Sequence, residues 1–298
     1  MSTSTALASI HCLTIAEAAA RLSPHGLWPA QLDTCTLALP DPAVPPRFAS
    51  RCYRAIAAPG GANLYWDLPL LVAAHQLGDG ASAMADAYVR GWLAAGTAPN
   101  GLPYWGNHYF WDFARSTMVG FVSSEEPAAV ITGDQAIYHE LRPLPVPWGV
   151  LARVDADATA RALHACRRHI VGADGSFDRH ATVAPVAGNQ HAFLESGAIL
   201  ALGWVGSGDP LLIGEARRII AYSAAQRGRS GLLRNSPTLD RWDMHASTSE
   251  LGMWAGAVAR CGELLHDPAL IELAAEQLAL WLDLAWDEAA GRFHGRLD

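Results

Sequence analysis

The sequence predicts an all-α protein in which antiparallel helical hairpins follow one another around a ring, with an inner and an outer layer of helices. Three observations lead to this fold class. A pattern repeats every 55 to 60 residues, helical segments alternate between apolar and amphipathic character, and no stretch shows the alternation of a half-buried strand. With 298 residues, 51% of them hydrophobic, the chain is long enough to bury a large core.

The repeat is clearest in two stretches that begin at Gly175 and Gly231. Each runs from a glycine turn through a polar loop with Asp-Arg and His into a helix with Glu-x-Gly, and then through Asp-Pro into a second helix. The two glutamates, Glu195 and Glu250, are 55 residues apart. Another glycine turn starts at Gly291, so the sequence predicts that one hairpin is the unit of the fold.

The two helices of each hairpin differ in composition. Residues 190–205 and 246–261 are rich in Gly and Ala and almost wholly apolar, which suits inner helices that are covered on all sides. Residues 211–226 and 268–285 carry Glu, Arg and Gln on one face, which suits outer helices with one face in solvent.

Weaker copies of the pattern lie upstream. Residues 63–96 predict a helix pair, GLPYWGNHYFWDFARSTMVGFV predicts a loop and a helix, and DADATARALHACRRHIV predicts the partner helix. We expect a single domain over 1–298, with an N-terminal extension over 1–58 and a proline-rich insert over 123–154, where LRPLPVPWG excludes regular helix. About four and a half hairpins are recognisable, which predicts an incomplete ring or a shorter arc and leaves truncation at the C-terminus open.

Composition restricts the partners. A net charge of −8 and a pI of about 5.8 give no general electrostatic reason to bind nucleic acid or an anionic membrane. The five cysteines are far apart and form no CxxC motif, which indicates a reduced compartment and no zinc site. No Lys or Arg precedes the apolar N-terminal part, and the longest apolar run, 198–205, is too short to span a bilayer. We therefore expect a cytoplasmic protein without cofactor or metal, and the oligomeric state stays open.

The polar loops that lead into the inner helices contain most candidates for chemistry. In a ring of hairpins these loops open at the same end, so we expect their side chains to converge on one mouth. Glu195 lies in an almost wholly apolar helix, where a buried carboxylate is unfavourable unless it is paired or used. We expect Glu195 to have a raised pKa and to act as a general acid. His108 and Asp112, like His191 and Glu195, are four residues apart and would share one face of a helix.

The remaining roles follow from side-chain chemistry. The expected catalytic residues are Glu195, with Glu140 or Asp112 as its partner carboxylate, and His191. Arg179 and Arg241, which we match across the repeat, are expected to bind a substrate carboxylate, and Trp105 or Trp242 to stack on a sugar ring. The other expected substrate-binding residues are Asn107, His108, His139, His180, Asn189 and His245.

These stretches resemble a known group of enzymes. NLYWDLPLLVAAHQLGDG is similar to the helix pairs of the six-hairpin glycosidases, the (α/α)-toroid enzymes that include unsaturated glucuronyl hydrolases and β-glucuronidases. The stretch that begins YHELRPLPVPWG resembles a segment of uncharacterised bacterial proteins in that superfamily. The resemblance covers about residues 60–298 and implies a glycoside hydrolase for uronic-acid-containing or other acidic saccharides, with carboxylates as acid and base.

A second resemblance implies different chemistry. GNQHAF is similar to the Asn/His pair of the toroidal alginate and heparinoid lyases. In that interpretation Asn189 and Arg241 neutralise a uronate while His191 removes its C5 proton. The loop over 231–249 contains no tyrosine, so Tyr104 or Tyr109 would have to serve as the second proton carrier. A non-catalytic helical scaffold is the third alternative, and it would place His108, His139, His180, His191 and His245 in no common cavity.

Overall fold

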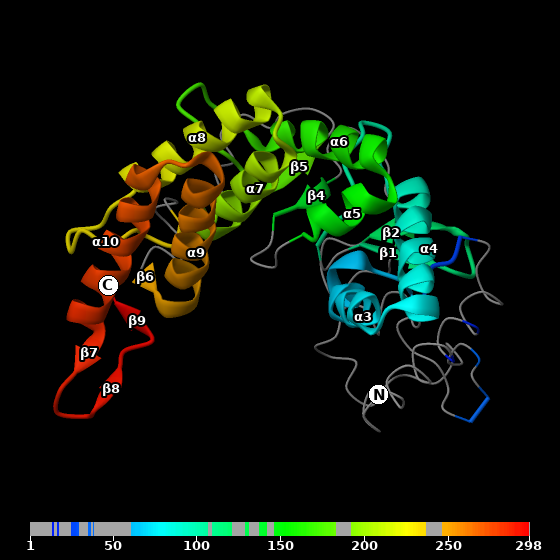
Figure 1. Cartoon of the computed structure of the whole chain (residues 1–298), viewed down its shortest axis with the longest axis horizontal. Helices are drawn as coiled ribbons and strands as arrows, with labels where there is room; N and C mark the ends of the chain where they lie inside the picture. Colours follow the sequence, from blue (N-terminus) through cyan, green and yellow to red (C-terminus); the bar gives the residue numbers. More distant parts are fainter. Residues whose placement is uncertain are drawn as a thin grey trace. The chain divides into compact units, whose positions relative to one another are not determined.

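The computed structural model describes residues 14, 17, 25–29, 35–36, 38, 61–106, 109–120, 129–130, 137–141, 146–182, 192–236 and 246–297. The chain divides into two compact units. Unit 1 comprises Met1–Tyr138 and Val150–Ala162, and unit 2 comprises His139–Gly149 and Leu163–Asp298. The expectation of one domain over 1–298 stays a prediction. Figure 1 labels the helices and strands of both units.

Unit 1 contains the first predicted helix pair, α3 (Leu64–Leu77) and α4 (Asp79–Ala95). Asn63 caps α3, because its side-chain oxygen accepts from the backbone N–H of Trp66. The Asp67 carboxylate accepts from the hydroxyl of Tyr88 at 2.6 Å and so ties the first turn of α3 to the second half of α4. Part of the predicted N-terminal extension belongs to this core, since Trp28 is 4% exposed and lies edge-on to the Tyr88 ring at 5.2 Å.

The stretch after this pair is a sheet, and the predicted helix there is wrong. Strands β1 (Tyr109–Asp112), β2 (Thr117–Gly120) and β3 (Ala129–Val130) form an antiparallel sheet in the order β1-β2-β3. Aromatic and β-branched residues favour strands, and Asp112 makes the turn between β1 and β2 by accepting from the backbone N–H groups of Ala114 and Arg115. Asp112 therefore ends a strand and does not share a helical face with the residue four positions earlier.

The end of the predicted insert is helical. Helix α5 (Trp148–Val154) begins directly after the prolines, and α6 (Ala156–Ala165) continues into a short 3₁₀ helix, η2 (Cys166–His169). Helix α6 is the predicted partner helix. The first proline of the insert stretch that the structure describes, Pro147, lies just outside α5, as a residue that cannot supply a helical N–H should.

Unit 2 contains the two predicted full hairpins, and both are confirmed. They are α7 (Leu194–Ser207) with α8 (Pro210–Ala225), and α9 (Thr248–Leu265) with α10 (Pro268–Ala285). Helices α7 and α9 pack against each other, while α8 packs on α7 and α10 on α9 (Figure 1). The inner and outer layers are therefore those that the sequence predicts. Asp209 and Asp267 cap the outer helices, each followed by proline in the first turn.

Small residues allow the inner layer to pack closely. A Cβ atom on Gly197 would lie 2.3 Å from the Phe177 ring, and one on Gly203 would lie 2.4 Å from the Trp148 ring. Both positions of α7 are occupied by neighbouring aromatic side chains instead. The Gly/Ala content of this helix thus serves close approach and is consistent with an inner position.

The glycine turns fix the register between successive repeats. Gly175, Gly231 and Gly291 have φ values of 90°, 87° and 58°, which favour glycine. The backbone carbonyl of the residue four positions after each glycine accepts a hydrogen bond from a backbone N–H earlier in the chain. For the last two glycines, that N–H belongs to the first residue of the preceding inner helix. These bonds are Leu141 N–H to Arg179 O at 2.7 Å, Leu194 N–H to Asn235 O at 3.1 Å and Thr248 N–H to Gly295 O at 3.2 Å.

This register differs from one predicted match. Arg179 and Asn235 occupy equivalent places after their glycines, since both carbonyls accept the same type of backbone bond. By this backbone criterion Asn235 is the counterpart of Arg179, whereas the sequence match of Arg179 with Arg241 was made on the Asp-Arg letters. Arg241 itself lies outside the described residues.

Short strand pairs accompany these turns. Strand β4 (Ile137–Glu140) pairs with β5 (His180–Thr182), β6 (Ala246–Ser247) with β9 (Arg296–Leu297), and β7 (Trp286–Asp287) with β8 (Arg292–Phe293). The expectation that no strand occurs anywhere is wrong for these short pairs. Among the helices that the structure describes, none is long and apolar enough to cross a membrane.

Candidate functional site

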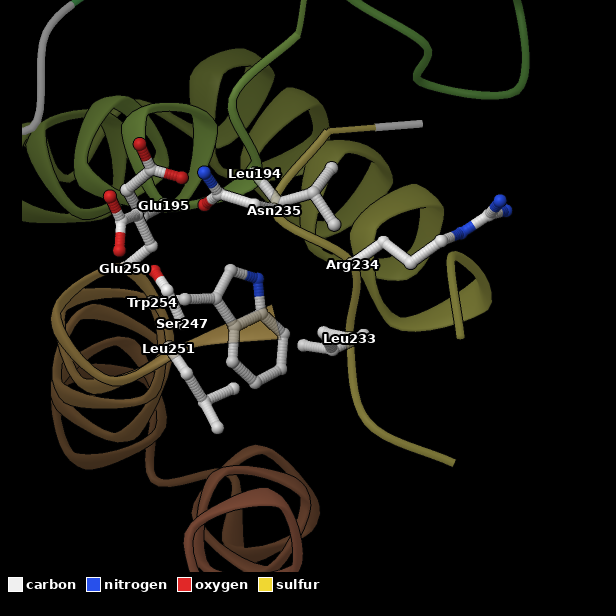
Figure 2. Close-up of a pocket in the computed structure, with 9 residues that line it drawn as sticks. All are labelled: Leu194, Glu195, Leu233, Arg234, Asn235, Ser247, Glu250, Leu251 and Trp254. Atoms are coloured by element: carbon white, nitrogen blue, oxygen red, sulfur yellow. The ribbon is translucent and has the colours of Figure 1, made fainter. Parts of the chain in front are cut away.

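The inner helices of unit 2 begin at a common recess. Its volume is about 210 Å³, including the space open to solvent. The first turns of α7 and α9 form one part of its lining and the turn after Gly231 forms the other (Figure 2). The first turns of α7 and α9 thus face the same recess, whereas the polar loops over 183–191 and 237–245 lie outside the described residues, so the expectation that these loops open at one end stays a prediction. The lining residues are Leu194, Glu195, Leu233, Arg234, Asn235, Ser247, Glu250, Leu251 and Trp254.

Two carboxylates from equivalent positions of the repeat meet at this recess. Glu195 is 3% exposed, and Glu250 is partly exposed. Both lie in the first turn of their helix, where the helix dipole favours negative charge. The hydroxyl of Ser249 donates to Glu250 at 2.6 Å, and that of Ser196 lies 3.5 Å from Glu195. Figure 2 shows both carboxylates on the same side of the recess.

Four other polar atoms of the lining are buried without a hydrogen-bond partner among the described residues. They are Arg234 Nε, Asn235 Oδ1, Ser247 Oγ and Trp254 Nε1. Because nearly all buried polar groups in native proteins are hydrogen-bonded, these four atoms are the hydrogen-bonding groups that the described lining leaves open. Figure 2 shows the Trp254 ring in the middle of the recess and the Arg234 side chain extending away from the two glutamates.

The sequence analysis assigned no role to these four residues. Arg234 and Asn235 are the third and fourth residues after Gly231, and the glycine turn was the available signal for them. Trp254 lies four residues after Glu250 on α9, which places the two one turn apart on the same face. The Trp254 side chain is 1% exposed, so it supports the floor of the recess with its ring covered.

A second polar cluster in unit 2 joins β4 and β5. Glu140 is 1% exposed, and its Oε1 lies 3.4 Å from His180 Nε2 and 4.0 Å from Arg179 Nε. Arg179 Nε–H donates to His180 Nε2 at 3.1 Å, which assigns the proton of a neutral His180 to Nδ1. Three predicted site residues, Glu140, Arg179 and His180, are thus brought together.

This cluster adjoins the start of α7. The Arg179 guanidinium carbon lies 4.9 Å from the centre of the Phe193 ring, a cation–π contact. Phe193 is the N-cap residue of α7, two positions before Glu195. The arginine is therefore held beside the helix that supplies the buried carboxylate of the recess.

His139 is buried against another histidine, so its contacts do not support the predicted role in substrate binding, which stays a prediction. The side chain is 1% exposed, and its Nδ1 lies 2.8 Å from Nε2 of His169, which is fully buried. Adjacent strand residues point to opposite faces, so His139 lies behind the strand when Glu140 faces Arg179. Burial, with the neighbouring His169 second, holds the pKa of His139 well below its usual range, so the ring is neutral.

Two other predicted residues serve the structure of unit 1. The Asp112 carboxylate accepts from two backbone N–H groups of its own turn and lies 3.5 Å from Arg115 Nε. Trp105 is 2% exposed and lies edge-on to Tyr65 at 5.2 Å, which does not fit a ring that stacks on a sugar. Asp112 is thus engaged in a turn, and its predicted role as partner of Glu195 has no support.

Seven predicted residues lie outside the described part of the chain. Their roles stay predictions. Whether the five candidate histidines share a cavity is likewise untested, because only His139 and His180 are among the described residues. No group of three or more His, Cys, Asp or Glu side chains suited to a metal occurs among the described residues. The seven residues are Asn107, His108, Asn189, His191, Arg241, Trp242 and His245.

No family model and no curated protein matches the sequence. Solved structures do resemble the chain. An unsaturated glucuronyl hydrolase of Bacillus sp. GL1, responsible for the degradation of glycosaminoglycan, aligns with 74% of this chain at a TM-score of 0.51 and 11% identity. A D-mannose isomerase aligns with 80% of this chain at a TM-score of 0.54 and 10% identity.

The chain spans 63% of the length of that hydrolase and 65% of the length of the isomerase. At such low identity the likeness concerns the fold alone. The glucuronyl hydrolases are α/α toroids, and the layered hairpins of unit 2 follow the same plan. The chain therefore has the helical-hairpin fold of the toroidal glycosidases that the sequence resembles.

Proposed function

We propose that the recess of unit 2 is the active site of a glycoside hydrolase that acts on a saccharide containing a uronic acid or another acidic sugar. The observation that carries this proposal is the meeting of two repeat-equivalent carboxylates, Glu195 and Glu250, with four buried polar atoms in one recess. Most glycoside hydrolases use a pair of carboxyl groups at the scissile bond, one of them as the general acid. A sugar also supplies the hydroxyl groups that the buried polar atoms require.

The two glutamates differ in a way that suits two roles. Glu195 is almost completely buried, and burial disfavours the charged form of a carboxylic acid. We assign it as the general acid, which gives its proton to the leaving glycosidic oxygen. Glu250 is more exposed and activates a water molecule or attacks the anomeric carbon itself. The separation of the two carboxyl groups in the working enzyme decides between inversion and retention.

The cationic side chains favour an acidic sugar. Arg234 lines the recess, and Arg179 lies beside the start of α7 on the Phe193 ring. Guanidinium groups bind carboxylates through two parallel hydrogen bonds, which an ammonium group does not provide. In a chain with a net charge of −8, locally placed arginines are needed to hold an anionic substrate.

The experiment is a screen of uronic-acid oligosaccharides with two detectors, one for new reducing ends and one for absorbance near 235 nm. The proposal expects reducing ends without a rise in absorbance. Glu195→Gln should reduce kcat by at least about 100-fold with little change in binding, because general acid catalysis contributes roughly 10²–10⁴-fold. Glu263→Gln is the matched control, since it makes the same change on the exposed end of α9.

Two results would contradict the proposal. One is a Glu195→Gln variant that is folded, as judged by circular dichroism, and retains nearly full activity on the best substrate. A rise in absorbance that depends on His191 would instead favour the lyase, whose residues Asn189, His191 and Arg241 lie outside the described part of the chain.

A second candidate is the interconversion of an aldose and a ketose. It is favoured by the His180–Glu140 pair at 3.4 Å, because an imidazole beside a buried carboxylate suits transfer of a proton between adjacent carbons. The fold likeness to a D-mannose isomerase adds to it. Incubation with D-mannose and detection of a ketose tests it, with His180→Gln expected to abolish the product.

A further inference from the structure

Three hydrogen bonds form a chain behind the Glu140 cluster. Cys166 Sγ lies 3.9 Å from His139 Nε2, His139 Nδ1 lies 2.8 Å from His169 Nε2, and His169 Nδ1 lies 2.7 Å from the carbonyl oxygen of Asp178. Cys166 and His169 are fully buried and His139 is 1% exposed. These hydrogen bonds connect η2, the His139 position of β4 and the turn before β5, and all the residues that form them belong to unit 2.

The direction of these bonds follows from the carbonyl at one end. A carbonyl oxygen only accepts, so His169 must carry its proton on Nδ1 and accept on Nε2. His139 then carries its proton on Nδ1 and accepts on Nε2, where the Cys166 thiol donates. Every member is satisfied while both rings are neutral. Burial lowers the pKa of His169 to about 4 and that of His139 further below its usual range, which agrees with this neutral arrangement.

Asp178 is held at both of its peptide groups by the same histidine. Its N–H donates to the backbone oxygen of His169 at 2.8 Å, while its carbonyl accepts from the His169 ring. Its carboxylate accepts from the N–H of His180 at 2.9 Å. A displacement of Asp178 would therefore move the two residues that follow it.

Those two residues are the ones that face Glu140. The carbonyl of Arg179 accepts from the N–H of Leu141 at 2.7 Å, so the turn is bonded to the strand end that contains Glu140. The His139–His169 bond makes a second connection between the same two segments, on the other face of β4. The position of Arg179 and His180 relative to Glu140 thus depends on bonds made on both faces.

We propose that His169 and His139 are positioning residues: they hold the Asp178–His180 turn so that Arg179 and His180 face Glu140. This rests on the proposed function in one respect, namely that Arg179 binds the acidic part of the substrate. The bond that matters is the one from His169 Nδ1 to Asp178. Without it, the turn loses the constraint on its carbonyl and Arg179 is less often in the position that binds an anion.

Two variants of His169 separate this bond from its neighbour. The amide of asparagine places an N–H near the position of Nδ1, and the amide of glutamine places its polar atoms near Nε2. His169→Asn should keep the donor to Asp178 and lose the acceptor for His139. His169→Gln should keep the acceptor for His139 and lose the donor to Asp178. Both remove the same imidazole from the same core position.

We expect the two variants to differ in three measurements on the full chain. In His169→Gln, exchange of the Leu141 amide should be about 5- to 10-fold faster, as expected for loss of one buried hydrogen bond, and the imidazole ¹⁵N signals of His180 should shift. KM for the best acidic saccharide should also rise by about 5- to 10-fold, while kcat should stay within about 2-fold of wild type. This is the result expected when binding alone is weakened. In His169→Asn all three should stay close to wild type.

A matched control removes a histidine that takes no part in the hydrogen bonds among Cys166, His139 and His169. His164→Gln alters an exposed histidine, whose Nε2 lies 2.9 Å from Asp209 on the outer layer of unit 2. It should change none of the three measurements. If neither His169 variant folds, His139→Asn, which keeps a donor toward His169 Nε2, and His139→Gln, which does not, provide the same comparison with the same expected order.

Equal effects of the Asn and Gln variants on Leu141 exchange and on the His180 signals would overturn the proposal, since a plain packing role treats the two amides alike. Failure of the proposed function looks different. Wild type would then turn over no acidic saccharide, while the exchange and ¹⁵N measurements would still separate the two variants.

Discussion

The hairpins α7–α8 and α9–α10 follow one sequence pattern and differ in how much of it is buried. Ile220 of α8 is 2% exposed, whereas Leu278, 58 positions later on α10, is 41% exposed. Gly197 of α7 is covered by the Phe177 ring, whereas no described atom outside its own helix lies within 4 Å of a Cβ placed on Gly252 of α9. The repeat thus determines which residues are apolar, and the neighbours determine which of them are buried.

The difference follows from the position of each hairpin in the row. Trp148 and Phe177 cover one side of α7, and α9 covers another. Among the described residues, α9 packs against α7 and α10 and has no comparable helix on its other side. In repeat proteins a hairpin gains much of its stability from the interfaces with its neighbours, so equal sequences contribute unequal stability.

The largest expected effect comes from deleting the equivalent aliphatic side chains. Ile220→Ala should lower the free energy of unfolding by about 2–5 kcal/mol, because it opens a cavity in the core. Leu278→Ala should lower it by less than about 1 kcal/mol, because the leucine is already largely in solvent. Urea unfolding followed by circular dichroism measures both. Equal losses would mean that α10 is covered by a partner in solution.

A smaller effect, of opposite sign in the two hairpins, is expected for the glycines. Gly197→Ala should destabilise by about 1–3 kcal/mol, because the new methyl group overlaps the Phe177 ring. Gly252→Ala should stabilise by about 0.5–1 kcal/mol, because alanine loses less backbone entropy in a helix. The midpoints of thermal unfolding of the two variants should therefore lie on either side of that of wild type. A loss of stability in both would remove the contrast between the hairpins.

The smallest effect concerns the caps of the outer helices, where the hairpins are alike. The pKa of Asp209 is lowered, first by the N–H of Leu212, and that of Asp267 is lowered, first by its bond with Arg217. A carboxylate with a lowered pKa in the folded state contributes stability above its unfolded pKa, and that contribution is lost as the pH falls through the folded pKa.

Asp209→Asn and Asp267→Asn keep a capping oxygen and remove the charge. Each should lower the urea midpoint at pH 7, and this effect should shrink as the pH falls through the lowered folded pKa of the aspartate, where wild type itself loses the charge. At 1 M NaCl the effect of Asp267→Asn should shrink more than that of Asp209→Asn, since salt screens its ion pair with Arg217. The reverse order would show that the backbone N–H groups dominate in both caps.

The repeat predicted the hairpins of unit 2 because each helix has its own signal: small apolar residues for α7 and α9, and Asp-Pro with an amphipathic pattern for α8 and α10. The repeat wrongly predicted a helix over 109–120. A short aromatic stretch is compatible with either a helix or a strand, and here the turn made by Asp112 produces a strand pair. The pairing of strands distant in sequence, such as β6 with β9, leaves no local pattern to find.

The candidate site was predictable to a similar extent. Glu195 was selected because a carboxylate in an apolar helix is conspicuous, and it does line the recess, whereas Glu250 was recognised only as its repeat match and was given no role. Asn235 was missed because letters were compared, whereas the backbone bond to Leu194 sets the true register. The burial of His139 was not foreseen, because a sequence does not reveal its contact with His169, thirty residues away.

The bond from Leu194 to Asn235 has a consequence for recombination between related chains. The recess takes Glu195 from one hairpin and the turn after Gly231, with Glu250, from the next. A chimaera joined at Gly231 would therefore take Leu194 and Glu195 from one parent and the rest of the described lining from the other, although each of its helices came from a single parent. A crossover inside α10 would transfer the whole recess, because all residues of its lining lie between Leu194 and Trp254. A change of specificity in such a chain then requires compatible residues in two successive hairpins, since each hairpin supplies only part of the recess.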